Sequence, residues 1–509
     1  MTRNPPASSS HTARGSRQKA DVCLILEGSY PYVTGGVSGW AHGLLHEQSH
    51  LSFHICAIMP RDGDLTLRYD LPSNVVGLTT IRLNDLPTGA AIDTGLASRL
   101  HRALRAPLAN LTGAKPMPLS DLKTIMDVLR GSRASLGTAA LLDREEAWKQ
   151  LVDLYESGFP DHSFLDYFWS YRAIAGGLYS VLLAALPQAD IYHAMSTGYA
   201  GLMAARAKVE TGKPVFVTEH GIYTNERRIE VTAADWLEAT SSKALTIDKP
   251  RRDLRDMWID SINNFSRVCY EASDRIITLF AGNQKPQLED GAPAEKLQII
   301  PNGVDIQRFG ALAHRRGDTP TIGFIGRVVP IKDVKTFIRA CGLLRQTAPE
   351  MKAYIIGPTD EDADYYTECT HLVQLLGLEQ TITFTGQAKV DDYLPRIDVL
   401  VLTSISEAQP LVMLEAGAAG IPIVATDVGS CRELIEGTPE EAPHLGMGGI
   451  VTPLASPAAT ADAVFTLLSD TALYDAASTT ISTRVAQYYN EGIQHQAYRT
   501  LYAEHLRRA

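Results

Sequence analysis

The sequence predicts an α/β protein with two Rossmann-like domains that face each other across a cleft. A chain of 509 residues is too long for one hydrophobic core, which predicts at least two large domains. Short apolar strand segments alternate with helical segments, most clearly in the second half, and this pattern is typical of parallel sheets covered on both faces. Glycine-rich and charged segments follow the strand ends, where open α/β sheets bind ligands.

The composition narrows the class of function. Hydrophobic residues make up 45% of the chain and charged residues 21%, as in ordinary soluble enzymes. The formal charge of −11 argues against nucleic acid as a partner, although a local site can still hold an anionic small molecule. The six cysteines form no C-x-x-C pair, which predicts reduced, buried thiols in a cytoplasmic protein. Ala173–Pro187 is too short to span a bilayer and predicts a buried helix, so direct membrane insertion is not expected.

The first domain is expected to cover residues 21–305. Residues 1–20 are polar, lack the apolar core of a signal peptide and predict a disordered tail. An apolar strand begins at Asp21, and a glycine-rich turn over Tyr30–Gly39 leads into a helix that begins at Trp40. Further strands are predicted at Phe53–Met59, Val75–Leu83, Ile191–Met195, Pro214–His220 and Asp274–Phe280. Residues from about 97 to 186 are helical in pattern and predict an insertion.

The second domain is expected to cover residues 306–480. Its strands are predicted at Thr321–Arg327, Lys352–Gly357, Thr381–Gly386, Asp398–Ser404 and Pro422–Asp427. Helical segments lie between them, at Val334–Gln346, Tyr365–Gly377, Val390–Arg396 and Leu411–Gly420. Residues 481–509 predict C-terminal helices that pack back on the first domain.

The segment after Asp398–Ser404 predicts an anion-binding helix end. Pro410 suits the first helical position, where its missing N–H is not needed. The amides of Leu411, Val412 and Met413 then have no partner within the helix. Such a helix end attracts an anion, and phosphate in particular.

Two carboxylates flank this helix start. Glu407 lies in the loop before the helix, and Glu415 lies within the helix among apolar and small residues. A carboxylate in such surroundings is costly unless it is hydrogen-bonded, so sugar or ribose hydroxyls are candidate partners. The alternative is that Glu415 is a solvated helix residue and Glu407 a loop charge.

A pair of cations follows the strand that ends near Arg327. Arg327 leaves the strand end, and Lys332 follows five residues later. An arginine grips phosphate oxygens with several donors, and a lysine adds a point charge. The alternative is a solvated surface pair.

Two features of the first domain are weaker candidates. Gly36, in the Gly35-Gly36 pair, would let backbone amides approach a ligand closely, although such a pair is also an ordinary turn. His220 ends a predicted strand, where a structural histidine is the alternative. Two D-x-D segments, Asp62–Asp64 and Asp362–Asp364, match the pattern that holds a metal–diphosphate, but both lie in polar runs and are expected to be solvated.

Taken together, these motifs resemble glycosyltransferase family 4. The resemblance rests on four segments of the second half: Asn302–Asp305, Gly326–Asp333, the Glu407-x7-Glu415 spacing and AGAAGIPIVATDVG at 416–429. Two further segments, Leu26–Trp40 and Thr218–Glu230, look like the subgroup of soluble enzymes that make Pel exopolysaccharide. The resemblance implies the GT-B fold, a UDP-sugar donor, retention of anomeric configuration, and no metal or other cofactor.

The resemblance also implies roles for the candidate residues of the second domain. Glu407 would contact the donor sugar near the reacting centre, and Glu415 would hold the ribose hydroxyls. Arg327 and Lys332 would neutralise the leaving diphosphate. One departure concerns the loop after Glu407, where many family members have a glycine-rich sequence and this chain has Ala408-Gln409-Pro410. This departure leaves the choice of hexose open.

In the first domain, Gly36 would pack its backbone on the phosphates and His220 would support the developing oxocarbenium charge. The resemblance makes residues 21–305 the acceptor domain and residues 306–480 the nucleotide-sugar domain. The implied reaction moves a hexose from UDP-glucose or a UDP-N-acetylhexosamine to a growing polysaccharide acceptor of Pel type. The implied partner is an inner-membrane Pel synthesis or export complex, and the implied location is the cytoplasm. Two alternatives are a GT-B-fold sugar-nucleotide 2-epimerase and a non-catalytic UDP-sensing subunit of an export complex.

Overall fold

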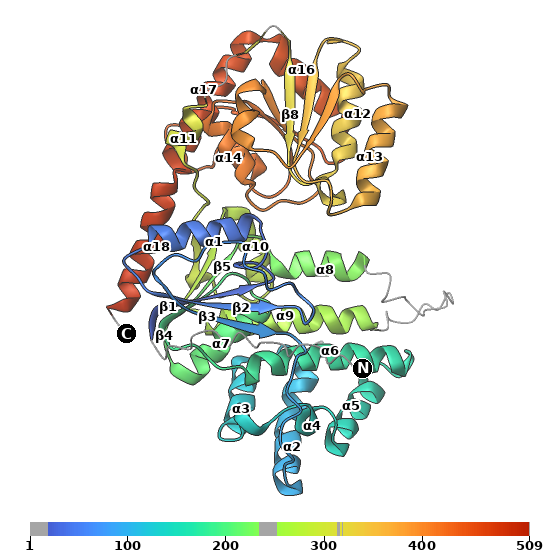
Figure 1. Ribbon diagram of the computed structural model, residues 1–509, viewed down its shortest axis with the longest axis vertical. Coiled ribbons are helices and arrows are strands. Elements are labelled where there is room, and N and C mark those ends of the chain that lie inside the picture. Colours follow the sequence, from blue (N-terminus) through green and yellow to red (C-terminus); the bar gives the residue numbers. More distant parts are fainter. Residues whose placement is uncertain (1–18, 114, 234–251, 313–315, 318, 508–509) are drawn as a thin grey trace, which may run out of the picture. The chain divides into compact units, whose positions relative to one another are not determined.

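The computed structural model describes residues 19–113, 115–233, 252–312, 316–317 and 319–507 (Figure 1). The expected tail therefore lies outside the described residues, apart from Lys19 and from Ala20, which already belongs to a strand. The chain forms two compact units. Unit 1 extends to Thr278 and includes Gln284–Gln298 and the residues from Arg499, whereas unit 2 comprises Leu279–Asn283 and Ile299–Tyr498. The change of unit thus comes before the predicted boundary at residue 306.

Unit 1 is built on a seven-stranded sheet with the order β3-β2-β1-β4-β5-β6-β7. Its strands are β1 Ala20–Glu27, β2 Phe53–Met59, β3 Val75–Arg82, β4 Ala189–Ala194, β5 Val215–Glu219, β6 Arg275–Thr278 and β7 Leu297–Ile299. The pairings from β3 through β6 are parallel. Six strands lie where apolar runs predicted them, but β7 was not predicted, because three residues give too short a pattern.

The helices of unit 1 form a cover and an insertion. The cover consists of α1 Gly36–Glu47, α7 Tyr199–Thr211, α8 Tyr223–Ala233, α9 Leu254–Ala272 and α10 Gln284–Glu289. The insertion consists of α2 Thr94–Leu111, α3 Leu119–Leu129, α4 Thr138–Leu141, α5 Glu145–Gly158 and α6 Phe164–Leu183, close to the predicted 97–186 (Figure 1). The predicted turn over Tyr30–Gly39 was too long, because α1 begins at Gly36 rather than at Trp40.

Unit 2 contains a six-stranded sheet with the order β10-β9-β8-β11-β12-β13, parallel throughout. Its strands are β8 Thr321–Ile325, β9 Lys352–Ile356, β10 Ile382–Gly386, β11 Val399–Leu402, β12 Ile423–Thr426 and β13 Gly449–Thr452. Its helices are α11 Ile306–Gly310, α12 Val334–Leu344, α13 Ala363–Leu375, α14 Leu411–Ala418, α15 Cys431–Glu436, α16 Pro457–Ser469 and α17 Thr471–Tyr488. The last helix, α18 Glu491–Leu506, passes from unit 2 into unit 1.

Two predictions for unit 2 were wrong in detail. The helix predicted over Val390–Arg396 is two short 3-10 turns, Val390–Asp392 and Leu394–Arg396, and Pro395, which has no N–H to donate, interrupts a regular helix here. The strand β13 was not predicted. Both errors concern segments too short for a periodic pattern to be decisive.

The C-terminal segment divides between the units, whereas residues 481–509 were predicted to pack on the first domain. Ile481 and Val485 of α17 are buried in the core of unit 2, where a Cβ at Gly417 of α14 would lie 2.9 and 2.8 Å from them. In unit 1, the Tyr502 hydroxyl is hydrogen-bonded to Nδ1 of the buried His193 at 2.7 Å. Only the residues from Arg499 therefore belong to unit 1.

The cores confirm the expected burial. All six cysteines are free and buried, as the sequence predicts. The apolar stretch at Ala173–Pro187 supplies the buried second half of α6 rather than a membrane span. Within the described part of the chain, no helix combines the length and apolar character needed to cross a bilayer.

The two strand orders place ligand-binding crevices in equivalent positions. In each sheet the order reverses beside the first strand, between β1 and β4 in unit 1 and between β8 and β11 in unit 2. Ligands of open α/β sheets bind beyond the carboxyl ends of the strands at such a switch point. The loops after these four strands are therefore where functional side chains are expected.

Candidate functional site

The switch point of unit 2 brings Lys332 and Glu407 together. Lys332 follows β8 and Glu407 follows β11, and the lysine Nζ lies 2.5 Å from Glu407 Oε1. Ser404 Oγ donates a hydrogen bond to the same carboxylate oxygen at 2.5 Å. The side chains are only 19% and 11% exposed, so the ion pair is shielded from water and its interaction is stronger than that of a surface pair.

The loop that carries Glu407 is held from the β12 side. Thr426 Oγ1 donates to the carbonyl of Ser404 at 2.6 Å, and the Ser430 amide donates to the carbonyl of Ala408 at 2.8 Å. Gly429 has a φ of +55°, and a Cβ there would lie 2.3 and 2.4 Å from the carbonyl oxygens of Ala408 and Glu407. Only glycine fits at position 429, so backbone contact fixes the loop from this side.

Arg327 lies at the same sheet edge but is not drawn into this ion pair. It follows Gly326 at the end of β8 and donates to Glu361 at 2.7 Å, with its side chain 53% exposed. The two cations that the sequence singled out thus differ. Lys332 is shielded beside Glu407, whereas Arg327 forms an exposed ion pair that a ligand can readily displace.

The helix start differs from the prediction by one residue. Pro410 is the N-cap of α14, which begins at Leu411. The amide of Met413 is not free, because it donates to the Pro410 carbonyl at 3.1 Å. The amides of Leu411 and Val412 have no acceptor within the helix by its geometry, and they remain available to an anion.

Glu415 lies in α14, half-buried beside an ion pair. Burial raises its pKa to about 7, and the nearby Arg308 guanidinium only partly opposes this rise. Arg308 is engaged with Asp391, at 3.0 and 2.6 Å. Among the residues that the structure describes, no side chain donates a hydrogen bond to the Glu415 carboxylate. Its oxygens are therefore free to accept hydroxyl groups.

The departure after Glu407 has a structural explanation. Gln409 is 5% exposed, and its side-chain oxygen accepts the Asn302 amide at 2.6 Å. The Asn302 side chain donates back to the Gln409 carbonyl at 3.4 Å. Gln409 thus fixes the loop to the Asn302–Asp305 segment instead of extending into open space.

In unit 1, His220 packs against Trp40 of α1, the helix that begins at Gly36. His220 directly follows β5, and its ring lies 4.7 Å from the Trp40 ring of α1 in an edge-on arrangement. Burial lowers the pKa of His220 to about 4, so the ring is neutral near pH 7. Its Nε2 is buried without a hydrogen-bond partner among the described residues. Gly36 is the first residue of α1, and a Cβ there would meet nothing within 4 Å, so packing within the chain does not require glycine.

Glu219, which the sequence analysis did not single out, lies next to His220. It is 1% exposed and accepts hydrogen bonds from Tyr270 Oη at 2.6 Å and Gln287 Nε2 at 2.8 Å. Burial raises its pKa to about 7, and these hydrogen bonds only partly oppose the rise. Its partners come from α9 and α10, far along the chain, so no local sequence signal marks this site.

The two D-x-D segments lie in exposed places. Asp62 and Asp64 are exposed, and Asp64 accepts the Thr66 amide at 2.9 Å and pairs with Arg68. Asp362, predicted to lie in a loop, is the N-cap of α13 and accepts the Tyr365 amide at 2.8 Å. Over the described ranges, no group of three or more His, Cys, Asp or Glu side chains is arranged to hold a metal ion.

Two family models match the chain. Residues 20–295 match the model described as Domain of unknown function (DUF3492), and residues 319–470 match Glycosyl transferases group 1. The first match covers almost all of unit 1, including the helical insertion. The second covers all six strands of unit 2, with Arg327, Lys332, Glu407 and Glu415.

Curated relatives that match part of the chain are named glycosyltransferases. The D-inositol 3-phosphate glycosyltransferase of Paenarthrobacter aurescens is 30% identical over 193 residues, which are 35% of this chain and 45% of that protein. The Kineococcus radiotolerans enzyme of the same name is 27% identical over 40% of this chain and 51% of its own length. The chain thus spans about half the length of the curated relatives it matches.

Solved structures match over nearly the whole chain. Anabaena HepE in complex with UDP has a TM-score of 0.57 at 16% identity and covers 94% of this chain and 99% of its own. The sucrose-phosphate synthase of Thermosynechococcus elongatus has a TM-score of 0.55 at 17% identity and covers 95% and 100%. These likenesses show the two-domain GT-B fold.

Proposed function

We propose that this chain, which belongs to the family described as Domain of unknown function (DUF3492) and carries a Glycosyl transferases group 1 domain, is a glycosyltransferase that moves a hexose from a UDP-sugar to a saccharide acceptor with retention. The shielded Lys332–Glu407 pair at the switch point of unit 2 carries this proposal. It supplies a cation for a diphosphate beside a carboxylate for the sugar. HepE, which shares the fold, has been solved with UDP and with UDP-glucose.

Each group of the nucleotide sugar has a matching group in unit 2. Lys332, Arg327 and the amides of Leu411 and Val412 would bind the diphosphate, because cations and helix N-termini favour phosphate oxygens. Glu415 would accept the two ribose hydroxyls, which would satisfy a half-buried carboxylate. Metal ions are not needed in this proposal, since the chain's own charges balance the leaving group.

The transfer forms one bond and breaks one bond. The acceptor hydroxyl oxygen bonds to the anomeric carbon of the donor while the bond from that carbon to the β-phosphate oxygen breaks. UDP leaves with the electron pair, and its phosphate takes the hydroxyl proton. Glu407 would stabilise the positive charge that develops on the sugar, because a fixed carboxylate in a shielded site acts strongly on such charge. His220, neutral near pH 7, would support the sugar by position or through its carbonyl.

The finer assignment is to Pel exopolysaccharide synthesis. It rests on the resemblance of Leu26–Trp40 and Thr218–Glu230 to PelF, the soluble glycosyltransferase of that system. On this assignment the donor is UDP-glucose or a UDP-N-acetylhexosamine, the acceptor is the growing polysaccharide, and the enzyme works in the cytoplasm beside an inner-membrane complex.

A UDP-release assay on the full chain tests the proposed function. UDP-glucose, UDP-N-acetylglucosamine, UDP-N-acetylgalactosamine and GDP-mannose are each incubated with and without neutral oligosaccharides. We expect UDP release that rises with acceptor, and its loss in Glu407→Gln. The matched control is Glu368→Gln, because Glu368 is exposed and pairs with Lys335 of α12 rather than with Lys332.

Other outcomes of this assay would identify a different function. UDP release without any dependence on acceptor would favour the epimerase. UDP binding with no release under any condition would favour the sensing subunit. Either result, obtained with folded protein, would overturn the transferase proposal.

A further inference from the structure

Unit 2 contains a cavity of about 290 Å³ that the proposed function does not use. Every residue that lines it belongs to unit 2, and Lys332, Glu407 and Glu415 are not among them. Its volume is close to the lower end of the range that is typical of small-molecule sites, about 300–1,000 Å³. The size and the separate lining make this cavity a candidate for a second binding site in unit 2.

One part of the lining comes from the segments where the chain passes between the units. Leu279 and Phe280 follow β6 at one crossing, and Ile299 and Pro301 lie at another. All four side chains are apolar, and Ile299 keeps 41% of its surface exposed. An apolar group in the cavity would therefore cover hydrophobic surface that the chain leaves open to water.

Three aromatic side chains line the cavity. Tyr488 is the last residue of α17, Tyr489 directly follows it, and Phe280 comes from the first crossing. Aromatic rings attract cations through the negative charge of their faces, most strongly where water is excluded. The apolar and aromatic part of the lining therefore suits the body of an organic cation.

The polar part of the lining is acidic. Among the described residues that line the cavity, Arg484 is the only cation, and Glu441 accepts its Nε at 2.6 Å and its Nη2 at 2.9 Å. The other N–H groups of Arg484 donate to three backbone carbonyls at 2.7–3.2 Å. Arg484 and Glu441 thus form a neutral pair with no donor left for a ligand. Glu433 and Glu440 give the cavity a net negative charge.

Glu433 of α15 is the carboxylate that would gain most from a cation. Burial raises its pKa, and hydrogen bonds from the amides of Gly282 and Ala281 only partly oppose the rise. The negative charge of Glu440 raises the pKa further. A cation bound beside Glu433 would stabilise its charged form.

These features select both the charge and the shape of a ligand. An anion would meet two carboxylates and no free donor from Arg484. A bare metal ion would leave the apolar lining uncovered, and the described residues offer no group of three or more side chains arranged to hold one. We propose that this cavity binds a small organic cation, with its ammonium group beside Glu433 and Glu440 and its aliphatic body on the apolar and aromatic lining. The inference does not depend on the proposed function.

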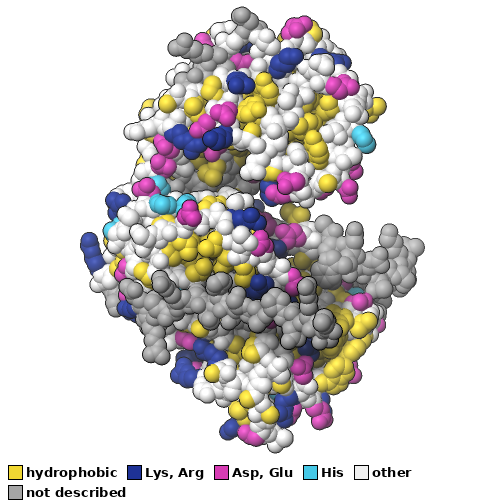
Figure 2. Space-filling view, in the orientation of Figure 1, with side chains coloured by type: hydrophobic (Ala, Val, Ile, Leu, Met, Phe, Trp, Pro, Cys, Tyr) yellow, Lys and Arg dark blue, Asp and Glu magenta, His cyan; other side chains and the backbone are white. Residues whose placement is uncertain are grey.

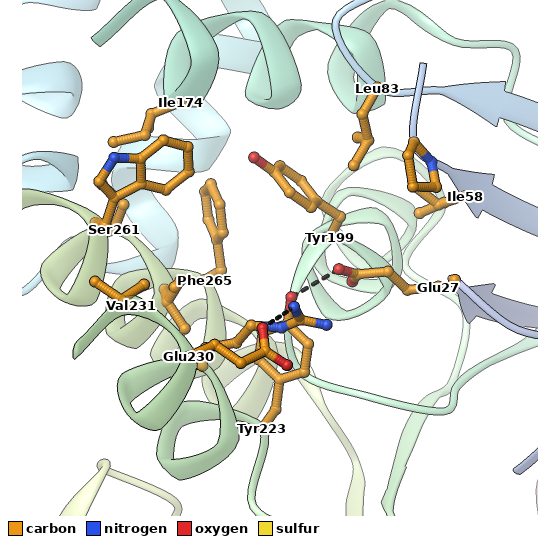
Figure 3. Close-up of a pocket in the computed structure, with 15 residues that line it drawn as sticks. Glu27, Ile58, Leu83, Ile174, Tyr199, Tyr223, Glu230, Val231, Ser261 and Phe265 are labelled. Carbon is orange, nitrogen blue, oxygen red and sulfur yellow. Dashed lines mark hydrogen bonds and ion pairs between the residues drawn. The ribbon is translucent and has the colours of Figure 1, made fainter. Parts of the chain in front are cut away.

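The cavity of unit 1 drawn in Figure 3 suits a cation less well. It measures about 380 Å³, and Glu27 at its polar end accepts the Tyr223 hydroxyl at 2.6 Å and the Ala200 amide at 3.2 Å. Arg227 lines the same cavity and pairs there with Glu230. A guanidinium repels a second cation at short range. An organic cation is therefore expected in unit 2 and not in unit 1.

Calorimetry on the full chain tests the proposal with four probes. They are choline, its uncharged isostere 3,3-dimethyl-1-butanol, butyrate and Mg²⁺. We expect choline to bind at least roughly tenfold more tightly than each of the others, because it alone combines a positive charge with an aliphatic body. Choline should also raise the thermal unfolding midpoint, since it binds the folded chain.

Two variants and a control locate the site. Glu433→Gln should weaken choline binding roughly tenfold, because it removes the charge and keeps the shape of the side chain. Thr438→Trp should abolish binding by filling the cavity that Thr438 lines. Glu379→Gln is the matched control, because Glu379 is an exposed glutamate of unit 2 that does not line the cavity.

Four outcomes, obtained with folded protein, would overturn the proposal. The first is no binding of choline to the wild-type chain, and the second is equal binding of the uncharged alcohol or of Mg²⁺. The third is displacement of choline by UDP, which would place the cation at the donor site. The fourth is loss of choline binding in Glu27→Gln with retention in Glu433→Gln, which would place it in the cavity of unit 1.

Parallel measurements keep this proposal separate from the proposed function. The unfolding midpoint and the UDP affinity of each variant show whether the chain is folded and the donor site intact. UDP release by the wild-type protein tests the transferase activity without choline. Failure of one proposal therefore leaves the test of the other unaffected.

Discussion

The two sheets share a strand order but differ in the chemistry of their carboxyl edges. In unit 2 the edge carries ion pairs, Lys332 with Glu407 and Arg327 with Glu361. In unit 1 the corresponding edge is lined by aromatic rings, and its carboxylates, Glu27 and Glu219, are bonded to tyrosine hydroxyls. Similar backbone topology thus carries ion pairs at the edge of one sheet and tyrosine-bonded carboxylates at the edge of the other. On the face drawn in Figure 2, charged side chains of both signs are scattered among hydrophobic ones on both units.

This difference bears on the donor site proposed for unit 2. A nucleoside diphosphate needs cations and free amides, which follow β8 and β11 in unit 2. The edge of unit 1 instead offers aromatic rings and carboxylates that already accept hydrogen bonds from tyrosine hydroxyls. Changes at the charged edge of unit 2 are expected to alter donor binding or turnover while unit 1 stays intact.

The largest effect is expected at Glu407. Glu407→Gln should lower turnover by ~10²–10³, because it removes a charge aimed at the sugar in the transition state. UDP affinity should not fall, since Lys332 loses its internal partner and becomes more available to phosphate. Single-turnover UDP release and UDP calorimetry on the same variant check both statements. Normal turnover in this variant would contradict the assignment.

The next effect separates the two cations. Lys332→Ala should weaken UDP binding by roughly 10- to 150-fold, because a charge-assisted contact contributes about 1.5–3 kcal/mol. Arg327→Ala should cost only a few-fold, since its side chain is 53% exposed and solvent screens its charge. Lys335→Ala, which removes a lysine paired with Glu368, is the control and should leave the affinity unchanged. Wild-type UDP affinity in all three variants would exclude a phosphate-binding role for Lys332 and Arg327.

A smaller effect concerns pH and Glu415. Its pKa is raised to about 7, so in the free protein the carboxylate is protonated increasingly as the pH falls below 7. A protonated carboxyl accepts ribose hydroxyls less well, and UDP affinity should fall by up to about tenfold between pH 8 and pH 6. Glu415→Gln should bind UDP more weakly at pH 8 and should lack this part of the pH dependence. The difference in pH dependence between wild type and Glu415→Gln isolates the contribution of Glu415, because the phosphate of UDP titrates in the same way with both proteins.

The raised pKa of Glu415 also predicts how the stability of the protein depends on pH. A carboxyl group whose pKa is raised on folding contributes stability that is fully present below its unfolded pKa of about 4.5 and is lost as the pH rises through about 7. The wild-type unfolding midpoint should therefore fall more steeply than that of Glu415→Gln over this range. A parallel pH dependence of the two midpoints would contradict the raised pKa.

Removal of metal ions by a chelator is not expected to change donor binding. Donor binding should survive EDTA, because the proposed neutralising charges come from Lys332, Arg327 and the start of α14. UDP-sugar affinity measured before and after EDTA checks this. If EDTA abolishes binding and Mg²⁺ or Mn²⁺ restores it, the donor site depends on a metal ion. The proposal that the charges of unit 2 alone neutralise the diphosphate would then be wrong.

Much of the fold could be predicted because its signals are local and repeated. The apolar runs of β1, β8 and β11 and the helical insertion occur near the predicted positions. The failures occur where local signals are short or ambiguous, as at β7, β13 and Val390–Arg396. Residues 481–498 were assigned to the wrong unit, because the burial of Ile481 and Val485 depends on α14, a helix far earlier in the chain.

The sequence by itself determined which chemical groups the chain places after its strands. Lys332, Glu407, Glu415 and the start of α14 could be selected from residue type, spacing and position after an apolar run. These signals suffice because a parallel strand sends its following loop to a known edge of the sheet.

Only the tertiary structure decided what those groups face. In the folded protein Lys332 is paired with Glu407 and Arg327 stays exposed. The Gln409 side chain accepts a hydrogen bond from the Asn302 amide. It also surrounded Glu27 with Tyr223 and the amide of Ala200, which are 196 and 173 residues away along the chain. Burial and hydrogen bonding between such distant residues set charge, pKa and access, and no local pattern in the sequence encodes them.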